Sequence, residues 1–188
     1  MLTHIGTKTL ATPRLILRRM TVDDAQDMYL NWAADEKVPR YLSWDVHKSV
    51  EATREILETW VAAYDNLENY HWVIEFDRTI IGTIGLHNIH SRHERCELGY
   101  CIGSKWWNKG LVTEAVGEVI RFAFREVNAN KVFALHDIEN AASGRVMQKN
   151  GMKPDGLLRE HNLRKDGTRG DLAYYSILKS EWMLGDQI

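Results

Sequence analysis

The spacing of hydrophobic and polar residues changes several times in the first third of the chain, and each change predicts an element. Alternation over residues 15–19 predicts a strand. A threonine followed by two aspartates predicts the start of a helix over residues 21–32. Residues 35–45 have no clean period and predict an irregular loop that could cover a site, whereas residues 48–64 carry apolar side chains on one helical face.

The middle of the chain has the clearest periodicity. Residues 71–76 and 79–86 are rich in β-forming residues and are separated by only an Asp-Arg pair, which predicts a tight hairpin. A third strand is expected at residues 95–102. Apolar residues at helical spacing over residues 111–127 then predict one long amphipathic helix, the best-defined helix of the sequence.

The last third predicts a short strand at residues 131–135, a helix at residues 141–149 that ends at an Asn-Gly pair, and two strands around a turn at Asp166 and Gly167. The order is an antiparallel meander, then strand-helix-strand-helix, then a terminal hairpin. This order indicates an α+β fold in a single domain of residues 1–188.

Composition narrows the class of protein. The chain has 188 residues, of which 44% are hydrophobic, enough to bury the core of one domain. No apolar run approaches the roughly 20 residues of a membrane helix, and the first ten residues lack the pattern of a secretory signal. We therefore expect no membrane partner and a cytoplasmic location. A net charge of -2 gives no basic field for direct binding of nucleic acid.

The strand at residues 95–102 leads into the long helix through a short segment that ends in Lys109 and Gly110. Neither residue has the side-chain oxygen that usually caps a helix start, so backbone amides remain free there. Gly110 lets a ligand approach the backbone, and the helix dipole with Lys109 favours an anion such as a pyrophosphate. A plain glycine turn into a core helix explains this feature, taken alone, equally well.

The order of segments and several motifs resemble the GNAT acetyltransferases, especially the branch that acetylates the N-termini of ribosomal proteins. The resemblance spans nearly the whole chain. It implies a mixed, mostly antiparallel central sheet flanked by helices, with a V-shaped splay between two central strands. The matching motifs are Arg14-Leu15-Ile16-Leu17-Arg18, Ile81-Gly82-Thr83-Ile84-Gly85-Leu86, Glu97-Leu98-Gly99-Tyr100, Trp107-Asn108-Lys109-Gly110, Thr113-Glu114-Ala115, Asn140-Ala141-Ala142-Ser143 and Lys149-Asn150-Gly151-Met152.

This resemblance implies acetyl-CoA as co-substrate and no metal. The backbone of the strand would pair with the pantetheine arm like an added strand, and amides at the helix start would hold the pyrophosphate. Val112 is bulkier than the residue usual at its place and would narrow the approach to the phosphates. For Asn140, capping of the next helix is an equally good explanation, and both roles are compatible. The implied cofactor-binding residues are Tyr100, Cys101, Ile102, Trp107, Asn108, Lys109, Gly110, Leu111, Val112, Thr113, Asn140 and Ser143.

Acetyl transfer requires a base, because an α-amine with a pKa of about 8 or a lysine with a pKa of about 10.4 is mostly protonated at neutral pH. The resemblance implies that the carboxylate of Glu97 takes this proton directly or through water. Pairing with a neighbouring arginine is the alternative explanation for Glu97. Glu160 is a second, lower-ranked carboxylate on the predicted substrate side.

Two further roles are implied for the same site. A backbone N–H of Cys101 or Ile102 would stabilise the oxyanion that forms when the amine attacks the thioester. Ser143 or Tyr100 would then reprotonate the thiolate, and Ser143 matches the branch better. The alternative explanation for Ser143 is an ordinary serine in the first turn of a helix.

Other polar side chains invite different chemistry. Cys96 and Cys101 lie five positions apart in one strand, an odd separation, so they point to opposite faces and are not expected to form a disulfide. A covalent acyl-enzyme would need an activating base beside a thiol, which the sequence does not indicate. His87, His90 and His93 resemble a metal cluster, but solvated loop histidines explain their spacing better.

Two other positions lie near the expected site. His136, beside Asp137, either touches substrate or caps the turn after the short strand. In the predicted loop, Tyr41 and Trp44 either form an apolar wall for the acceptor or pack on the loop's own core.

Three functions are consistent with these features. The first is acetylation of the N-terminal α-amine of a protein or peptide, with acetyl-CoA and this amine as partners. The second is acetylation of a small amine such as a polyamine or an antibiotic, and the third is a noncatalytic acyl-CoA-binding module. The resemblance is also compatible with a homodimer.

Overall fold

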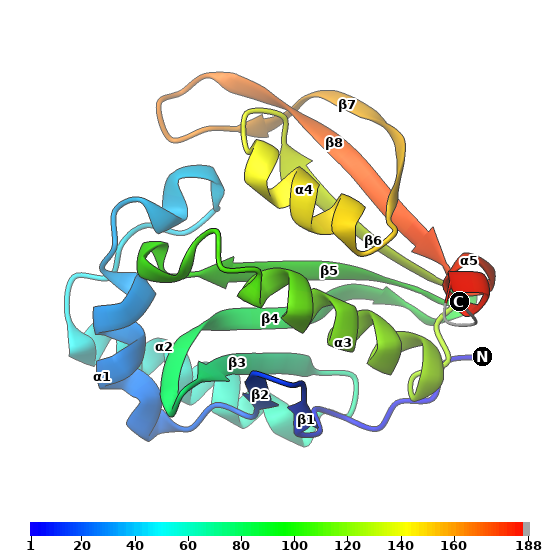
Figure 1. Cartoon of the computed structure of the whole chain (residues 1–188). Coiled ribbons are helices and arrows are strands. Elements are labelled where there is room, and N and C mark those ends of the chain that lie inside the picture. The colour runs from blue at the N-terminus through cyan, green and yellow to red at the C-terminus, as the bar shows by residue number, and fades with distance from the viewer. Residues whose placement is uncertain (186–188) are drawn as a thin grey trace.

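An eight-stranded sheet runs through the computed structural model, which describes residues 1–185 (Figure 1). Its spatial order is β1-β2-β3-β4-β5-β6-β8-β7, and among the described residues only the β5–β6 pair is parallel. The predicted meander, helical crossovers and terminal hairpin are confirmed. The strands are β1 (Leu10–Ala11), β2 (Leu15–Arg18), β3 (Tyr70–Phe76), β4 (Thr79–His90), β5 (Arg95–Ile102), β6 (Lys131–Asp137), β7 (Lys153–Leu163) and β8 (Arg169–Leu178).

Helices cover both faces of this sheet. One hydrophobic core joins the sheet to α3, α4 and α5, and a second core joins its other face to α1 and α2. The predicted helices after β5 and β6 are confirmed, whereas α5 has no counterpart in the sequence prediction. The α-helices of the described residues are α1 (Ala25–Met28), α2 (Val50–Ala62), α3 (Leu111–Arg125), α4 (Ala141–Lys149) and α5 (Lys179–Gly185).

The predicted helix over residues 21–32 is present but not uniform. It begins as a 3-10 turn at Val22–Asp24, continues as α1 and ends in a wider π-helical turn at Tyr29–Ala33. In that turn the Nδ2 of Asn31 donates to the carbonyl of Ile80 at 2.8 Å, while the next two residues are buried. The wider turn therefore coincides with a contact to β4. The hydrophobic periodicity of the sequence does not reveal such contacts.

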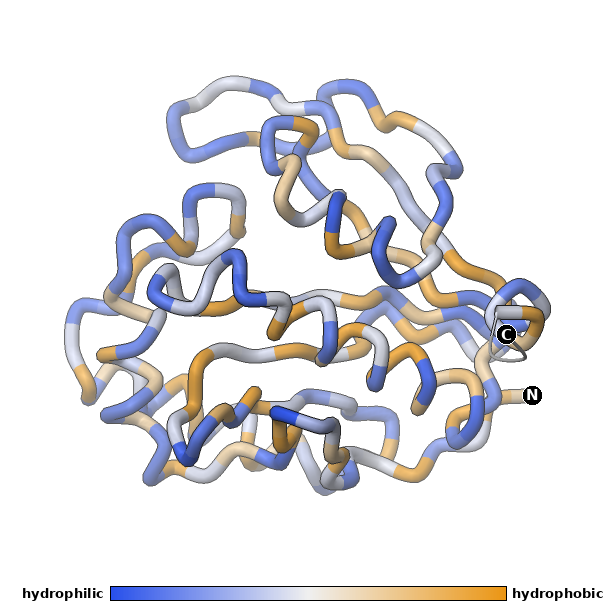
Figure 2. Tube along the Cα trace, viewed as in Figure 1, coloured by the Kyte–Doolittle hydropathy of each residue, from blue (hydrophilic) through white to orange (hydrophobic). Residues whose placement is uncertain are grey.

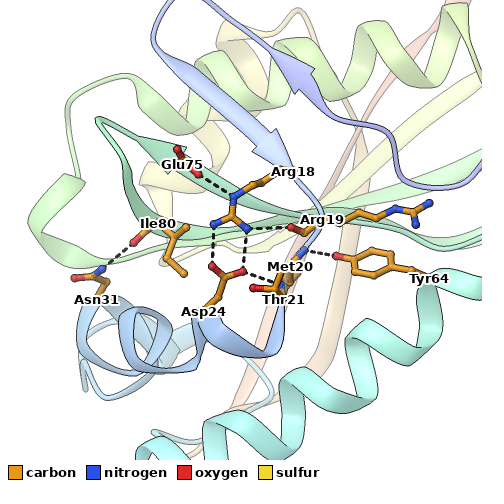
Figure 3. A network of polar contacts seen from close by, with 9 residues as sticks. All are labelled: Arg18, Arg19, Met20, Thr21, Asp24, Asn31, Tyr64, Glu75 and Ile80. Atoms are coloured by element: carbon orange, nitrogen blue, oxygen red, sulfur yellow. Dashed lines mark hydrogen bonds and ion pairs between the residues drawn. The ribbon is translucent and has the colours of Figure 1, made fainter.

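Arg18 at the end of β2 connects the sheet to this helical segment (Figure 3). Its Nη2 and Nη1 donate to the carboxylate of Asp24 at 2.8 and 2.9 Å, and its Nε donates to Glu75 on β3 at 2.8 Å. The hydrogen bonds that Arg18 donates to Asp24 and Glu75 raise its pKa despite its partial burial. Nearby, the hydroxyl of Tyr64 accepts from the amide of Met20 at 3.0 Å. These hydrogen bonds hold the helical segment against the sheet, and so they fix where the loop before α2 begins.

The hairpin between β3 and β4 turns through Asp77 and Arg78, which both have positive φ, 48° and 60°. Two consecutive residues with positive φ match the twist of the flanking strands, so the predicted tight turn is confirmed. Apolar residues concentrate along the central strands, whereas the tip of the β7–β8 hairpin is mostly hydrophilic (Figure 2).

The central strands β5 and β6 separate in the middle of the sheet (Figure 1). Their parallel pairing joins Arg95–Glu97 to Lys131–Phe133 and goes no further. Residues 98–102 and 134–137 continue as strands that pair only with their outer neighbours, β4 and β8. The expected V-shaped splay between two central strands is therefore present, and Glu97 lies at its apex.

The described residues include no helix with the length and apolarity that crossing a bilayer requires. α3, with 15 residues, falls below the roughly 20 residues needed.

Candidate active site

A cleft of about 1560 Å³ occupies the space between the diverging strands. Four segments line it: the loop before α2, the C-terminal half of β5 with the start of α3, the end of β6 with α4, and the β7–β8 hairpin. Residues far apart in the sequence thus face one space. Of the predicted cofactor residues, those that line the cleft are Tyr100, Cys101, Ile102, Trp107, Asn108, Gly110, Leu111, Val112, Thr113, Asn140 and Ser143.

The start of α3 has the open geometry that the sequence predicts. Gly110 is the N-cap residue, with φ +74°, and no side chain caps the helix there. The carbonyl of Gly110 accepts the amide of Glu114 at 3.1 Å, which closes the first helical turn. The amides that precede Glu114 in that turn are the ones a helix leaves without an internal partner, so they are available to an anion.

Sequence reasoning missed the support beneath this helix start. The Nε of Arg14 donates to Glu114 Oε2 at 2.6 Å, its Nη1 donates to the carbonyl of Lys109 at 3.1 Å, and Thr12 Oγ1 donates to Glu114 Oε1 at 2.5 Å. Burial raises the pKa of Glu114, but hydrogen bonds from Thr12 and Arg14 outweigh it and hold this pKa below its usual value. Lys109 is absent from the cleft lining, although it is among the predicted cofactor residues.

Tyr100 and Ser143 meet across the cleft. The hydroxyl of Tyr100, on β5, lies 2.9 Å from Ser143 Oγ and donates to the Ser143 carbonyl at 3.1 Å, on α4. Burial raises the pKa of Tyr100 to about 12, with the bond to Ser143 acting in the opposite direction. The phenol therefore keeps its proton at neutral pH and has a hydroxyl neighbour through which to pass it.

Glu97 lies where β5 and β6 part, and it lines both the cleft and a smaller adjoining pocket. Its Oε2 accepts from Nδ2 of Asn88 at 2.6 Å. The partner of Glu97 is thus the amide of Asn88, whereas the alternative explanation supposed a neighbouring arginine. On the wall of the adjoining pocket, the rings of Phe133 and Tyr174 stack with centroids 5.0 Å apart.

The structure shows where Asn140 and His136, the two residues with open alternatives around α4, lie. Asn140 caps α4, since its side chain accepts the amide of Ser143 at 3.4 Å, and it also lines the cleft. His136 lines the cleft as well, and its Nδ1 lies 2.8 Å from the carbonyl of Asp137. A Cβ at Gly144 would lie 2.7 Å from His136 Nε2, so the glycine lets α4 approach the end of β6 closely.

The loop before α2 contributes Tyr41 to the cleft but not Trp44, which packs with the second core and against His47. A short 3-10 turn at Val38–Tyr41 is its only regular element among the described residues. Glu160, the second candidate base, is exposed at an irregularity of β7 and does not line either pocket.

The cysteines are free and point to opposite sides of β5, as predicted. Cys96 belongs to the core with α3, where burial raises its thiol pKa to about 12. Cys101 contacts the other core, and its Sγ lies 3.4 Å from Thr83 Oγ1. Burial raises the pKa of Cys101 as well, despite hydrogen bonds from Thr83. Both thiols are therefore poor nucleophiles, which favours direct transfer over an acyl-enzyme.

The three histidines of the suggested cluster are exposed. The rings of His90 and His93 are 4.3 Å apart, whereas that of His87 is 6.0 Å from His71. Within residues 1–185, no group of three or more His, Cys, Asp or Glu side chains is placed to hold a metal ion.

An ion-pair network holds the β7–β8 hairpin over the cleft. Arg164 donates to both carboxylate oxygens of the buried Asp137, at 2.7 and 2.8 Å, and pairs with Glu139 at 2.8 Å. Lys165 then pairs with Asp45 in the opposite loop at 2.8 Å. The Lys165–Asp45 pair thus joins the β7–β8 hairpin to the loop before α2, two of the segments that line the cleft.

Comparisons with known proteins agree with this geometry. The model of the acetyltransferase (GNAT) domain matches residues 14–153. The chain is 34% identical over 172 residues to the uncharacterized N-acetyltransferase YoaA of Bacillus subtilis (strain 168), over 90% of this chain and 96% of that one. It is 29% identical over 110 residues to the ribosomal protein uS5-alanine N-acetyltransferase of Escherichia coli (strain K12), over 58% and 56% of the two chains.

The fold is also similar to that of a solved structure. The microcin C7 self immunity acetyltransferase MccE, crystallised with acetyl-CoA and AMP, superposes with a TM-score of 0.81. The alignment covers 89% of this chain and 93% of that one at 18% sequence identity, so this likeness concerns the fold.

Proposed function

The chain belongs to the acetyltransferase (GNAT) family and is an acetyl-CoA-dependent N-acetyltransferase, and from this premise we propose that its acceptor is the α-amine of a protein or peptide N-terminus. The relative from Escherichia coli is named for acetylating an alanine of a ribosomal protein. An α-amine, with a pKa of about 8, also needs a weaker base than a lysine. A protein acceptor of this kind places the proposed activity in the cytoplasm.

The observation that carries the proposed mechanism is the arrangement of Glu97 and the open α3 start around one cleft. The residues present fit acetyl-CoA, because Gly110 has positive φ and places no side chain over the amides of the helix start. The amides of residues 108–113 would bind the pyrophosphate, and the free edge of β5 would pair with the pantetheine arm. This places the thioester near the apex, beside the proposed base.

Transfer then proceeds in a ternary complex. Glu97 takes a proton from the acceptor ammonium, and the neutral nitrogen forms a bond to the thioester carbonyl carbon. The carbonyl electron pair moves to oxygen, where a backbone N–H of Cys101 or Ile102 stabilises the oxyanion. The C–S bond breaks as the carbonyl re-forms. The sulfur receives a proton from Tyr100 or Ser143, and the surplus proton that the nitrogen loses as the amide forms returns to that donor hydroxyl, directly or through water.

Acetyl transfer to a panel of amines tests this proposal. Thiol release from acetyl-CoA would be measured with short peptides that have a free N-terminus, with the same peptides blocked at the N-terminus but containing lysine, with polyamines and with aminoglycosides. We expect turnover only with the free α-amine. Faster turnover of a polyamine or aminoglycoside would assign a small-molecule acceptor instead. CoA binding without turnover of any amine would favour the noncatalytic module.

A further inference from the structure

Asn88 and Glu97 face each other where the pairing of β4 with β5 is interrupted. The register is regular up to the His87–Glu97 pair and resumes at the His90–Arg95 pair, with an irregularity between them. Asn88 lies inside this bulge with φ +44°, in the left-handed region. Its Nδ2 donates to Glu97 Oε2 at 2.6 Å.

The bulge explains how an adjacent position can aim its side chain at Glu97. Side chains alternate between faces along a regular strand, and His87 already occupies the position opposite Glu97. An extra residue in the strand and a left-handed backbone bend the chain and redirect the next side chain. Asparagine is enriched among residues that adopt this backbone, but that preference alone does not require its amide to contact a carboxylate.

The contact has a chemical consequence for the proposed base. A neutral amide donor hydrogen-bonds the carboxylate without neutralising its charge, unlike an arginine partner. It also fixes the rotation of the carboxylate, because one oxygen is engaged and the other is left for the acceptor. We propose, on the basis of the proposed function, that Asn88 is a positioning residue that holds Glu97 in the orientation required for proton removal.

Other titratable side chains lie near Glu97. Arginine, histidine and tyrosine side chains reach this region from four strands. These groups are His87 and His90 on β4, Arg95 on β5, His161 on β7 and Tyr174 on β8. None of them is changed by a substitution at Asn88, so a lower kcat in an Asn88 variant reports on the Asn88–Glu97 contact.

Asn88→Gly is the decisive variant, because glycine adopts positive φ without strain and removes only the amide donor. We expect an unchanged melting temperature, an unchanged KM for acetyl-CoA and a kcat about tenfold lower. This split between kcat and KM would separate loss of the Asn88–Glu97 contact from a general structural defect. Asn88→Asp keeps a residue suited to this backbone but opposes Glu97 with a second carboxylate, so its loss of kcat should be larger.

Two results from single variants would overturn the proposal. One is a folded Asn88→Gly variant with wild-type kcat. The other is a Glu97→Gln variant with wild-type kcat, which would refute the base itself and with it the proposed mechanism. If Glu97→Gln is impaired, the double variant Asn88→Gly/Glu97→Gln should be no slower than Glu97→Gln alone, because Asn88 acts through that carboxylate. An additive loss would contradict the positioning role.

Discussion

The guanidinium of Arg14 and the carboxylate of Glu114 are 100 residues apart in the sequence, yet Arg14 Nε lies 2.6 Å from Glu114 Oε2. The backbone amide of Arg14 also donates to the same carboxylate, at 2.9 Å. Arg14 Nη1 also donates to the carbonyl of Lys109, in the segment directly before the start of α3. The turn between β1 and β2 therefore supports the segment proposed to bind pyrophosphate.

Arg14→Ala should loosen that segment. We expect the KM for acetyl-CoA to rise about three- to tenfold with kcat little changed, because the support lies under the binding loop and away from the apex. The pair is partly exposed, so the free energy of unfolding should fall by no more than about 1 kcal/mol. Steady-state kinetics and chemical denaturation measure the two effects. Arg14→Lys keeps the charge but loses the forked geometry, and full recovery of KM in that variant would show that charge alone suffices.

Gly110→Asp should weaken CoA binding by at least about tenfold, a change of about 1.4 kcal/mol. The carboxylate would repel the diphosphate and cap the amides of the helix start, which improves the helix while blocking the ligand. Calorimetry would measure CoA affinity and a thermal melt would confirm folding. Gly110→Ala is the matched control, because it shares the unfavourable φ of +74° without charge or capping oxygen. Wild-type affinity in a folded Gly110→Asp protein would show that the diphosphate binds elsewhere.

Removal of both proton donors should slow the chemical step. We expect the double variant Tyr100→Phe/Ser143→Ala to lower kcat about a hundredfold and each single variant to lower it far less, since the remaining hydroxyl can still protonate the departing thiolate. The pKa of about 12 for Tyr100 means that its donor form persists throughout the neutral range. The readout is kcat with acetyl-CoA saturating, alongside CoA affinity as the control for binding. A double variant with wild-type kcat would leave water as the proton source.

The buried pair of Asp137 and Arg164 should make stability depend on acidity. Hydrogen bonds from Arg164 hold the pKa of Asp137 below its ordinary 3.8 in spite of burial. A depressed carboxylate pKa stabilises the fold above the unfolded value, and this stabilisation is lost as the pH falls through the folded value. The free energy of unfolding should therefore decrease below about pH 4.

The variant Arg164→Ala separates this pair from the other carboxylates. It leaves the Asp137 carboxylate buried without its main partner, so we expect a melting temperature several degrees lower at pH 7. The difference from the wild type should shrink as the pH falls towards 4 and protonation removes the unpaired charge. Thermal melts of the two proteins across this range make the comparison, and a difference that stays constant with pH would assign the stabilisation to packing.

Much of the fold was predictable because local patterns specify it. The strand at β5, the helix at α4 and the two-residue turn at Asp77 and Arg78 occur as the spacing and composition predict. The uncapped helix start at Gly110 was also predictable from the sequence, since capping depends on the residues at one helix end. These features involve neighbours in the sequence, whose relationship is fixed by helix or strand geometry.

The sequence by itself determined the order of elements, the family motifs and the open helix start. Tertiary structure alone decided the partners: Asn88 rather than an arginine for Glu97, Ser143 for Tyr100, and Arg14 for Glu114. It also excluded Glu160 from the cleft. The physical reason is that these contacts depend on strand register, on one bulge and on the separation of β5 from β6. Each of these is set by packing across the whole sheet, so no local pattern records it.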